Sequence, residues 1–414
     1  MNVTIQPKPL RGVLEAISSK SDVHRLLICA ALCDGPVQIQ IDGLSQDIEA
    51  TARCLNALGA SVLLEEGRIR VSPIVHVPSN AVLDCGESGS TLRFLLPVAC
   101  ALGAEAAFTG SGRLPQRPLS PLYEQLEAHG VCLSAQGQMP LTIRGTLGTQ
   151  TPFVLAGDVS SQYISGLLMA LPLCGGEIVL TTPLESKPYV QMTLDTLRRF
   201  GVQAEPTASG WRVRRGALCA PQGPIAAQGD WSNAAFWLCA GAIAGPVTVR
   251  GLDRDSPQGD RAIVAFLQRM GAQVRWDGDS VTVWPGTLHA AQIDVRDTPD
   301  LAPVLAAVAA LAQGETVITG AARLRIKESD RLRTVQQTLQ ALGAQICATH
   351  DGLRIVGQKR LSGGQADACG DHRIAMMAAI AAAGCERPVT ITGAQAVNKS
   401  YPAFFEDYQR LCAQ

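Results

Sequence analysis

The stretch AAFWLCAGAIAGPVTVRG, residues 234–251, holds the pattern on which the fold depends. Its apolar, alanine-rich first part predicts a buried helix over residues 234–244, with Asp230 and Ser232 in position to cap the start. A Gly-Pro pair then ends the helix, and the β-branched residues in 247–251 predict a short strand. A buried helix that runs directly into a strand indicates a layered protein of helices and strands.

The residues that follow complete one structural unit. A polar loop over 252–259 leads to a second helix over 260–270, in which apolar residues recur at helical spacing. Two short strands are then expected, at 273–276 and 280–284. The unit therefore reads helix, strand, helix, strand, strand.

Two glycines mark this unit, and both recur along the chain at intervals of about 70 residues. One ends the apolar helix, at Gly35, Gly103, Gly175, Gly245, Gly314 and Gly384. The other lies in a Leu-Gly-Ala-like turn after the second helix, at Gly59, Gly130, Gly201, Gly271 and Gly343. Repetition at a fixed period indicates copies of one supersecondary unit, so we expect an α/β or α+β protein built from six copies.

The length and the repeat together predict two domains. A chain of 414 residues is too long for one ordinary core, and six copies give three for each domain. The sixth copy is cut short, and we expect Val3-Thr4-Ile5 at the N-terminus to supply its missing strands. Both termini then lie in domain I, residues 1–18 plus 230–414, and domain II comprises residues 19–229.

The overall charge excludes a surface built for polyanions in general. The chain has 35 Lys and Arg against 36 Asp and Glu, which gives a formal net charge of −1. A protein that covers nucleic acid or anionic lipid carries a clear basic excess instead. Any anion site must therefore come from a local concentration of Lys and Arg.

The 13 cysteines and the apolar runs indicate a cytoplasmic protein without a metal centre. There is no Cys-x-x-Cys pair, and most cysteines lie in apolar runs, so we expect buried free thiols in a reducing compartment. The chain opens on a strand-like segment without a signal pattern, and its longest apolar run, 301–312, is too short to span a bilayer. We therefore expect a soluble, cytoplasmic protein.

Unusual polar residues lie at one phase of the repeat, the front of the first helix. The six segments are 19–22, 87–91, 160–162, 230–233, 297–300 and 371–373. Helix capping explains their Ser, Thr and Asp residues, and it stays the alternative for Asp230 and Ser232. Capping does not explain Lys20, Arg25 or Arg373, because a cation opposes the positive end of the helix dipole. We therefore expect an anionic ligand at these helix starts.

A second phase, the loop before the second helix, adds further cations. They lie in the segments 113–117, 186–189, 327–331 and 398–400. If the copies are equivalent, the helix starts of each domain open on one surface, and two facing surfaces form an anion-attracting cleft. The cations exceed the needs of one phosphate, so a pair of substrates with several phosphate or carboxylate groups fits their number.

Two acids, Asp300 and Glu328, lie among these cations. Taken alone, the run Lys-Glu-Ser-Asp-Arg at 327–331 is more often the solvated start of a helix. Carboxylates do not help to bind anions, so in a cationic site we expect these two to transfer protons.

At these positions the sequence resembles the enolpyruvyl transferases along its whole length. The matching segments are Ser19-Lys20-Ser21 with Arg25, Gly86 to Ser90 with Arg93, Arg113 to Pro118, Ser160-Ser161-Gln162, Ser186 to Tyr189, Arg325 to Arg331, and Asp371-His372-Arg373. Seven motifs in the right order are specific, although each is modest alone. The resemblance implies a two-domain inside-out α/β barrel of six βαβαββ repeats, three per domain, with the active site in the cleft between the domains.

Within the family, the chain is most similar to the branch that acts on shikimate-3-phosphate. This similarity implies transfer of the enolpyruvyl group of phosphoenolpyruvate to the 5-hydroxyl of shikimate-3-phosphate, on the route to aromatic amino acids. The reaction passes through a tetrahedral intermediate that expels phosphate. No metal, organic cofactor, nucleic acid or membrane is implied, and a monomer is expected.

The resemblance also implies a role for each matched residue. Those expected to hold shikimate-3-phosphate are Lys20, Ser21, Arg25, Ser160, Ser161, Gln162, Ser186, Asp300 and Lys327. Those expected to hold phosphoenolpyruvate are Lys20, Gly89, Arg117, Gln162, Arg331, Arg373 and Lys399. Asp300 is expected to take the proton of the attacking hydroxyl and Glu328 to exchange one at the enol methylene, with Lys20 as a third catalytic residue. Gly89 leaves room beside phosphoenolpyruvate, so its mimic, the herbicide glyphosate, is expected to bind.

The chain departs from the family pattern at several positions. Ser18 replaces a usual glycine, His24 stands where asparagine is common, and Glu87 replaces an asparagine beside the phosphoenolpyruvate loop. We expect Glu87 to pair with Arg93 or with a neighbouring cation. Arg323 stands where some relatives place an asparagine on the substrate phosphate, so no role is carried over to it.

Two other functions stay open. The related UDP-N-acetylglucosamine enolpyruvyl transferase uses a cysteine in a loop that corresponds to residues 111–117, and this loop contains none. A non-catalytic anion-binding repeat protein is the second alternative. Such a protein would gain nothing from Asp300 and Glu328, which lower the affinity for anions.

Overall fold

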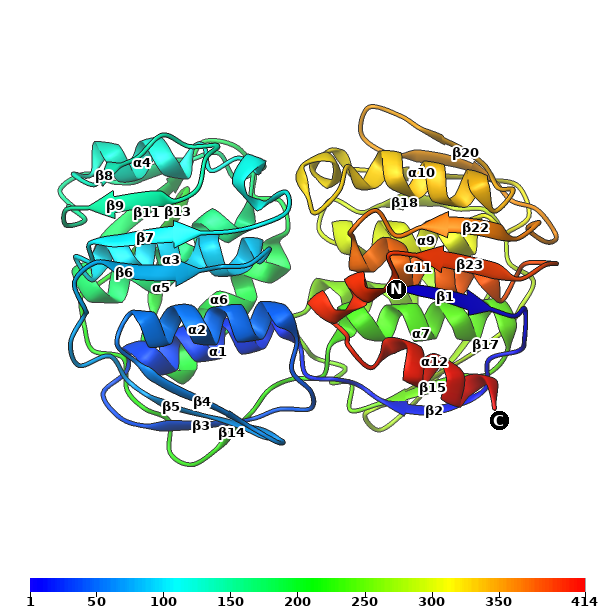
Figure 1. The fold of residues 1–414 in the computed structure, drawn as a ribbon, viewed down its shortest axis with the longest axis horizontal. Coiled ribbons are helices and arrows are strands. Elements are labelled where there is room, and N and C mark those ends of the chain that lie inside the picture. Colours follow the sequence, from blue (N-terminus) through cyan, green and yellow to red (C-terminus); the bar gives the residue numbers. More distant parts are fainter. Residues whose placement is uncertain (414) are drawn as a thin grey trace. The chain divides into compact units, whose positions relative to one another are not determined.

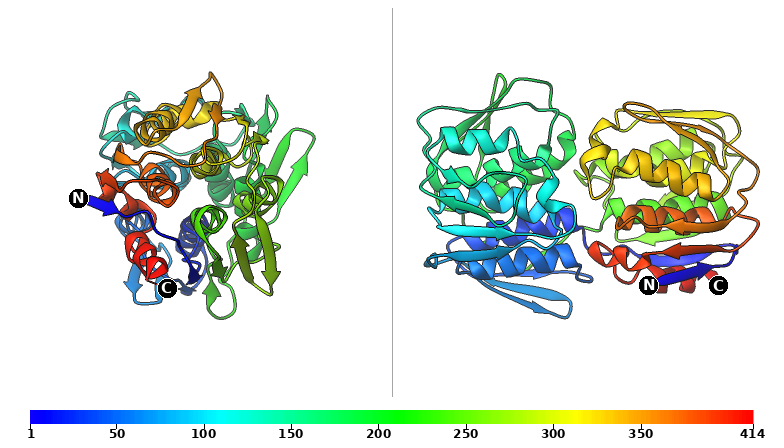
Figure 2. Two further views of the ribbon diagram at one scale, coloured as in Figure 1. Left: turned by 90° about the vertical axis from the view of Figure 1, so that its right-hand side faces the viewer. Right: turned by 45° about the horizontal axis from the view of Figure 1, so that its top comes forward.

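The chain forms two compact units in a computed structural model that describes residues 1–413 (Figures 1 and 2). Unit 1 comprises Met1–Ile17 and the chain from Gln228 onward, and unit 2 comprises Ser18–Ala227. Both units are mixed α/β, as the repeat predicts.

Unit 1 contains the N-terminal strands and the last three copies of the repeat. Its elements are β1 (Asn2–Ile5), β2 (Gly12–Glu15), α7 (Trp231–Ala244), β15 (Val247–Arg250), η2 (Gly259–Ala262), α8 (Ile263–Arg269), β16 (Gln273–Asp277), β17 (Ser280–Trp284), β18 (Gln292–Asp294), η3 (Pro299–Leu301), α9 (Ala302–Ala309), β19 (Glu315–Thr319), η4 (Ala322–Ile326), α10 (Arg331–Ala341), β20 (Gln345–Ala348), β21 (Leu353–Val356), β22 (Gly364–Asp367), α11 (His372–Ala382), β23 (Val389–Thr392), η5 (Ala394–Lys399) and α12 (Phe404–Cys412).

Unit 2 contains the first three copies. Its elements are α1 (Lys20–Leu32), β3 (Val37–Gln40), α2 (Gln46–Ala57), β4 (Ser61–Glu65), β5 (Arg68–Ser72), β6 (Ala81–Asp84), α3 (Gly89–Ala101), β7 (Ala106–Thr109), η1 (Leu114–Gln116), α4 (Leu122–Ala128), β8 (Cys132–Leu133), β9 (Leu141–Arg144), β10 (Phe153–Leu155), α5 (Ser161–Cys174), β11 (Gly176–Leu180), α6 (Lys187–Arg199), β12 (Ala204–Thr207), β13 (Gly210–Val213) and β14 (Ile225–Ala226).

The predicted order of helix, strand, helix, strand, strand is confirmed in the fourth copy by α7, β15, η2 with α8, β16 and β17. Asp230 caps α7 as expected, because its side chain accepts from the backbone N–H of Asn233 at 2.8 Å. The cap assigned to Ser232 is wrong. Ser232 lies inside the helix, and its hydroxyl donates to Asp260 instead.

The sheets show how each copy is joined to its neighbour. In the sheet β6-β7-β9-β8, the central strand β7 follows helix α3 and runs parallel to β6, with Ala81 opposite Ala106. On its other side β7 is antiparallel to β9, with Ala106 opposite Ile143. The parallel pair β6–β7 is joined through helix α3, and the antiparallel pair β8–β9 is joined by a short connection, which accounts for the βαβαββ order.

The N-terminal strands complete sheets formed by distant parts of the chain. Strand β1 pairs antiparallel with β23, with Asn2 opposite Thr392, so the expected contribution of Val3-Thr4-Ile5 to the sixth copy is confirmed. Only one strand is supplied there, because the sheet is β1-β23-β22, and β2 instead runs parallel to β15. In unit 2, β14 runs parallel to β3 in the same way.

The first helices of the copies form the core of each unit. Helices α7, α9 and α11 pack against one another in unit 1 (Figure 1), and α3 packs against α5 in unit 2. Every residue of α9 and α11 is buried, which suits helices that are apolar on all sides. Strands such as β5 alternate between buried and exposed residues, so one face of the sheet covers the helices.

The glycine in the turn after the second helix of a copy is required by the conformation of the backbone there. Gly271 has φ 97°, and a Cβ at this position would lie 2.3 Å from the carbonyl oxygen of Thr287. A side chain is therefore excluded by conformation and by contact. Between residues 1 and 413, no helix combines the length and the apolar character that a membrane crossing requires.

Candidate active site

Three helix starts meet in unit 1 through the guanidinium of Arg373. Its Nη2 donates to Oγ of Ser232 at 2.7 Å and to Oδ2 of Asp300 at 3.1 Å. Its Nη1 donates to the backbone oxygen of Asp300 at 3.2 Å. Because these residues begin α11, α7 and the η3–α9 segment, the expected convergence of helix starts is confirmed within this unit.

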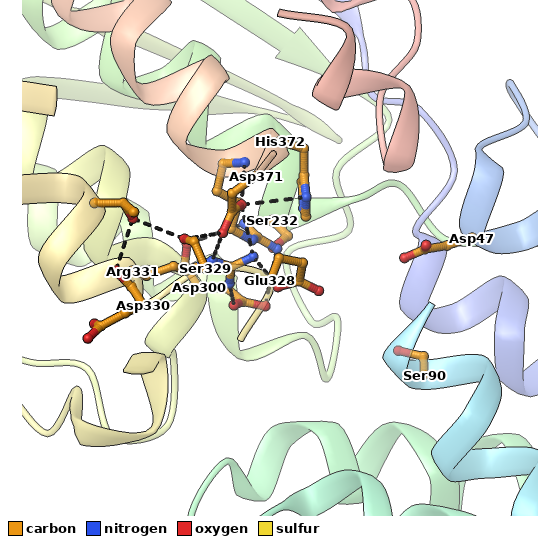
Figure 3. A network of polar contacts seen from close by, with 12 residues as sticks. Asp47, Ser90, Ser232, Asp300, Glu328, Ser329, Asp330, Arg331, Asp371 and His372 are labelled. Carbon is orange, nitrogen blue, oxygen red and sulfur yellow. Dashed lines mark hydrogen bonds and ion pairs between the residues drawn. The ribbon is translucent and has the colours of Figure 1, made fainter. Parts of the chain in front are cut away.

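Arg331 lies among three carboxylates (Figure 3). Its Nη1 donates to Asp300 at 2.8 Å, its Nη2 to Glu328 at 2.7 Å, and its Nε to Asp371 at 2.8 Å. Nη2 also donates to the second oxygen of Asp371 at 3.2 Å. Four of the five N–H groups of the Arg331 guanidinium thus donate to carboxylates. The carboxylates Asp300 and Glu328 hold a cation in place, a role that the sequence pattern did not reveal.

The Asp300 carboxylate is ionised at neutral pH. Burial by itself would raise its pKa, but Arg373, Lys327 and Arg331 together hold the pKa below the usual range of aspartate. Its side chain is 18% exposed, so a ligand can still reach it.

Asp260, which the sequence did not single out, lies behind Ser232. The hydroxyl of Ser232 donates to Oδ2 of Asp260 at 2.5 Å. Burial raises the pKa of Asp260 to about 6, and the negative charge of Asp300 adds to this effect, whereas Arg373 opposes it. The residue precedes α8 within η2, where a helix-starting aspartate is the ordinary interpretation.

The remaining expected residues of unit 1 lie at the ends of two short 3₁₀ segments. Lys327 follows η4 and is half-buried, and Lys399 ends η5 and is buried. Arg323, to which no role was carried over, donates through Nη2 to the backbone oxygen of Arg296 at 2.6 Å.

In unit 2, Lys20 is held by a carboxylate that the sequence did not single out. Nζ of Lys20, at the start of α1, lies 2.8 Å from Oδ2 of Asp47, in the first turn of α2. The side chains are 16% and 6% exposed. Acidic residues are common in the first turn of a helix, so only the fold could connect Asp47 with Lys20.

The starts of α3 and α5 meet through Gln162. Its Nε2 donates to Oγ of Ser90 at 2.9 Å, and Nη1 of Arg93 donates to its Oε1 at 3.4 Å. A Cβ at Gly89 would lie 2.6 Å from Nη1 of both Arg93 and Arg117. The glycine therefore leaves the space in which two guanidinium groups lie side by side.

The side chain of Arg25 is deeply buried in unit 2 and makes several hydrogen bonds there. It donates to the backbone oxygens of Ser21 at 2.6 Å and Tyr189 at 2.8 Å, and to the hydroxyl of Thr193 at 2.7 Å. Burial lowers the pKa of Arg25 to about 10, which still leaves it charged at neutral pH. Near Tyr189, Ser186 has φ 55°, a left-handed conformation that is rare outside glycine and fixes the start of α6.

Two other expected serines begin α5. The Ser160 hydroxyl caps this helix by accepting from the backbone N–H of Gln162 at 3.3 Å, and Ser161 is buried beside it. Glu87 lies against the loop that follows β7, because a Cβ at Gly112 would be 2.3 Å from its Oε1. The pairing expected between Glu87 and Arg93 stays a prediction.

All 13 cysteines are free, and those at positions 29, 33, 54, 85, 100, 239 and 385 are buried. In the described part of the chain, no three His, Cys, Asp or Glu side chains are grouped so that they could hold a metal ion.

Comparison with known proteins places this geometry in context. Residues 5–408 match the family model of EPSP synthase, 3-phosphoshikimate 1-carboxyvinyltransferase. A 3-phosphoshikimate 1-carboxyvinyltransferase of Clostridium kluyveri is 42% identical over 416 residues, which cover 99% of this chain and 97% of the relative.

Solved structures are similar over the same extent. An EPSP synthase from Acinetobacter baumannii superposes with a TM-score of 0.81 at 26% identity, covering 99% of this chain and 98% of the other. The enolpyruvyl transferase NikO from Streptomyces tendae has a TM-score of 0.80 at 19% identity, covering 99% and 96%, so it shares the fold.

Proposed function

The chain belongs to the EPSP synthase family, and on this premise we propose that it transfers the enolpyruvyl group of phosphoenolpyruvate to the 5-hydroxyl of shikimate-3-phosphate. The products are 5-enolpyruvylshikimate-3-phosphate and phosphate. The observation that carries the proposal is the match of 42% identity over 99% of the chain to a 3-phosphoshikimate 1-carboxyvinyltransferase. The cations and carboxylates at the helix starts supply the chemistry that this reaction needs.

We propose that the residues expected from the sequence bind these substrates. In unit 2 these are Lys20, Ser21, Arg25, Gly89, Arg117, Ser160, Ser161, Gln162 and Ser186. In unit 1 they are Asp300, Lys327, Glu328, Arg331, Arg373 and Lys399. Shikimate-3-phosphate and phosphoenolpyruvate together carry several phosphate and carboxylate groups, and guanidinium groups bind both kinds in pairs of hydrogen bonds.

Asp300 is the proposed base for the attacking hydroxyl. In the addition step, the oxygen of the 5-hydroxyl bonds to C2 of phosphoenolpyruvate and its proton passes to the Asp300 carboxylate. C3 receives a proton from Glu328, which carries one for this step in place of the negative charge that it shows beside Arg331. In the elimination step, the bond from C2 to the phosphate oxygen breaks and C3 returns a proton to the Glu328 carboxylate, which restores the double bond. The proton held by Asp300 passes to the departing phosphate, so that both carboxyl groups return to their starting states.

The surroundings of Asp300 support a base whose strength depends on bound substrate. Although the residue is largely buried, Arg373, Lys327 and Arg331 hold its pKa low, and a carboxylate of low pKa is a weak base. Anionic groups of the substrates on these same cations would offset their charge. The pKa of Asp300 would then rise toward the range in which it accepts a proton effectively.

The finer description of the fold also stays a proposal. Helices α9 and α11 are buried on all sides and the sheets lie outside them, which supports an inside-out α/β barrel in each unit. We propose that the units correspond to the two substrate-binding domains of a cytoplasmic, monomeric enzyme that needs no cofactor.

Release of phosphate tests the function directly. The chain is incubated with phosphoenolpyruvate and either shikimate-3-phosphate or UDP-N-acetylglucosamine, and free phosphate is followed with time. We expect release with shikimate-3-phosphate alone, with stoichiometric formation of the enolpyruvyl ether. Release only with UDP-N-acetylglucosamine would show that the chain has the activity of the related enzyme instead. Absence of release with both acceptors would favour a non-catalytic anion-binding protein.

A further inference from the structure

Asp260, Ser232 and Arg373 form a directed chain of hydrogen bonds in unit 1. Nη2 of Arg373 lies 2.7 Å from Oγ of Ser232, and this oxygen lies 2.5 Å from Oδ2 of Asp260. The three residues come from α11, α7 and η2, three elements that are far apart in the sequence.

The direction of the chain follows from the chemistry of its members. An arginine can only donate, so the Ser232 oxygen must accept from Arg373. The one hydroxyl proton of Ser232 is then available to Asp260, whose ionised carboxylate can only accept. Hydrogen bonds in which one partner is ionised are among the stronger ones in proteins, and each of these two links has one ionised partner, so each link restrains the next.

The position of Asp260 is itself fixed by its neighbour Gln258. Oε1 of Gln258 accepts from the backbone N–H of Trp231 at 3.1 Å, and its Nε2 donates to the backbone oxygen of Gly229 at 2.8 Å. The loop before η2 is thereby attached to the start of α7. Asp260 therefore stands on a rigid support, as a residue that aligns another group must.

We propose that Asp260 and Ser232 are positioning residues that fix the guanidinium of Arg373 and, through it, the carboxylate of Asp300. Nη2 of Arg373 donates to Ser232 and to Asp300 together, so the serine sets where the guanidinium lies when it faces the carboxylate. The inference rests on the proposed function, in which Arg373 holds phosphoenolpyruvate and Asp300 takes the hydroxyl proton. It adds two residues that touch neither substrate.

The alternative is that Asp260 only begins a helix. A residue that only begins a helix needs no partner outside its own element, and Asp260 accepts from a side chain of another helix, so helix starting alone does not account for its position. The charged groups around Asp260 are Asp300, Arg373 and Asp230, and each lies at the start of a first helix. The negative charge of Asp260 is thus placed where it acts on the cation of the site.

The test compares Ser232→Ala, Asp260→Asn and the double variant with the wild-type chain. For each, kcat and the KM of both substrates are measured by phosphate release, and thermal unfolding checks the fold. We expect both single variants to raise the KM for phosphoenolpyruvate about tenfold or more, with the KM for shikimate-3-phosphate changed less than about twofold. The KM of the double variant for phosphoenolpyruvate should not exceed that of the more impaired single variant, because both changes break the same series of hydrogen bonds.

Two further variants separate positioning from general stability. Ser232→Thr keeps the hydroxyl and should restore most of the affinity for phosphoenolpyruvate. Thr316→Val removes a different buried hydroxyl of unit 1, which accepts from the backbone N–H of Ala291 at 3.3 Å, and should leave both KM values unchanged.

Each outcome is decisive. A wild-type KM for phosphoenolpyruvate in both single variants, an equal rise of both KM values, or effects that multiply in the double variant would overturn the positioning role. If the wild-type chain itself releases no phosphate with shikimate-3-phosphate, the proposed function fails. In that case, calorimetry measures the affinity for phosphoenolpyruvate in the wild type and in Ser232→Ala. An unchanged affinity in the variant would reject the positioning role of Ser232 and Asp260.

Discussion

Nζ of Lys20 lies 2.8 Å from Oδ2 of Asp47, so a cation expected to hold substrate is already paired with a carboxylate of its own unit. The same holds for Arg373 and Asp300, at 3.1 Å. Such pairing limits the cost of burying a lone charge and fixes the direction in which each cation points. Under the proposed function, an anionic substrate would therefore meet cations that are positioned before it arrives.

The Lys20–Asp47 pair should be strongly coupled in stability. We expect Lys20→Met and Asp47→Asn each to lower the free energy of unfolding, and the double variant to lose less than their sum by about 1–3 kcal/mol. The reason is that either single change takes an opposite charge away from a group that is largely buried. Denaturant unfolding of the four proteins measures this coupling.

The exposed pair of Arg53 and Asp84 provides the control. Its atoms lie 3.4 Å apart, and its side chains are 49% and 57% exposed. Solvent screens such a pair, so its coupling in the same cycle should lie near zero. Equal coupling for the two pairs would contradict the importance of burial at Lys20.

Replacement of Asp300 should affect turnover more than binding. Asparagine keeps an oxygen for Nη1 of Arg331 but cannot take a proton, so we expect Asp300→Asn to lower kcat by about 10²- to 10⁴-fold. Steady-state kinetics with both substrates measure the change. Glu315→Gln, which alters an exposed carboxylate 3.5 Å from Arg354, is the matched control and should keep full activity. A kcat near that of the wild type in Asp300→Asn would remove Asp300 as the base.

A methyl group at Gly89 should disturb the site for phosphoenolpyruvate. The added Cβ would lie 2.6 Å from Nη1 of both Arg93 and Arg117, so these flexible side chains must move. We expect Gly89→Ala to raise the KM for phosphoenolpyruvate about tenfold and to weaken inhibition by glyphosate in the same direction. Gly216→Ala is the control, because a Cβ there meets nothing within 4 Å. Unchanged kinetics and inhibition in Gly89→Ala would show that the arginines adapt without cost.

The repeat made much of the fold predictable from the sequence. The helix and strands of the fourth copy follow from local patterns, because an apolar run, a Gly-Pro break and β-branched alternation each act over a few neighbouring residues. The pairing of β1 with β23 was also predictable, since a truncated copy leaves a sheet without its last strand. The place of β2 beside β15 was not, because nothing in residues 12–15 specifies which sheet they join.

The partners of the site residues were far less predictable. Asp47 lies 27 residues from Lys20, and Asp371 lies 40 residues from Arg331. Each of these acids occupies an ordinary helix-starting position, where its sequence context predicts capping alone. Asp371 does cap α11, accepting from the backbone N–H of Arg373 at 3.0 Å, and it binds Arg331 as well. Only the packed structure reveals the second role.

The raised pKa of Asp260 predicts opposite effects on stability and on substrate binding. Burial, with a contribution from Asp300, raises this pKa to about 6 in the folded chain, against about 3.9 for an unfolded aspartate. The folded state thus binds the proton more tightly, so this group lowers the free energy of unfolding as the pH rises from about 4 to about 6. We expect Asp260→Asn to remove that loss and to be more stable than the wild type at pH 8 by about 3 kcal/mol, with little difference at pH 4.

The affinity for phosphoenolpyruvate should improve as the pH rises, whereas the contribution of Asp260 to stability becomes less favourable. Below about pH 6 the protonated Asp260 no longer offers Ser232 a full negative charge, so the KM of the wild type for phosphoenolpyruvate should rise as the pH falls. Asp260→Asn should show a high KM without this dependence. Chemical unfolding and steady-state kinetics between pH 5 and 8 measure both effects. Because protonation of the substrate acts equally on both proteins, parallel KM profiles would show that the charge of Asp260 has no part in holding Arg373.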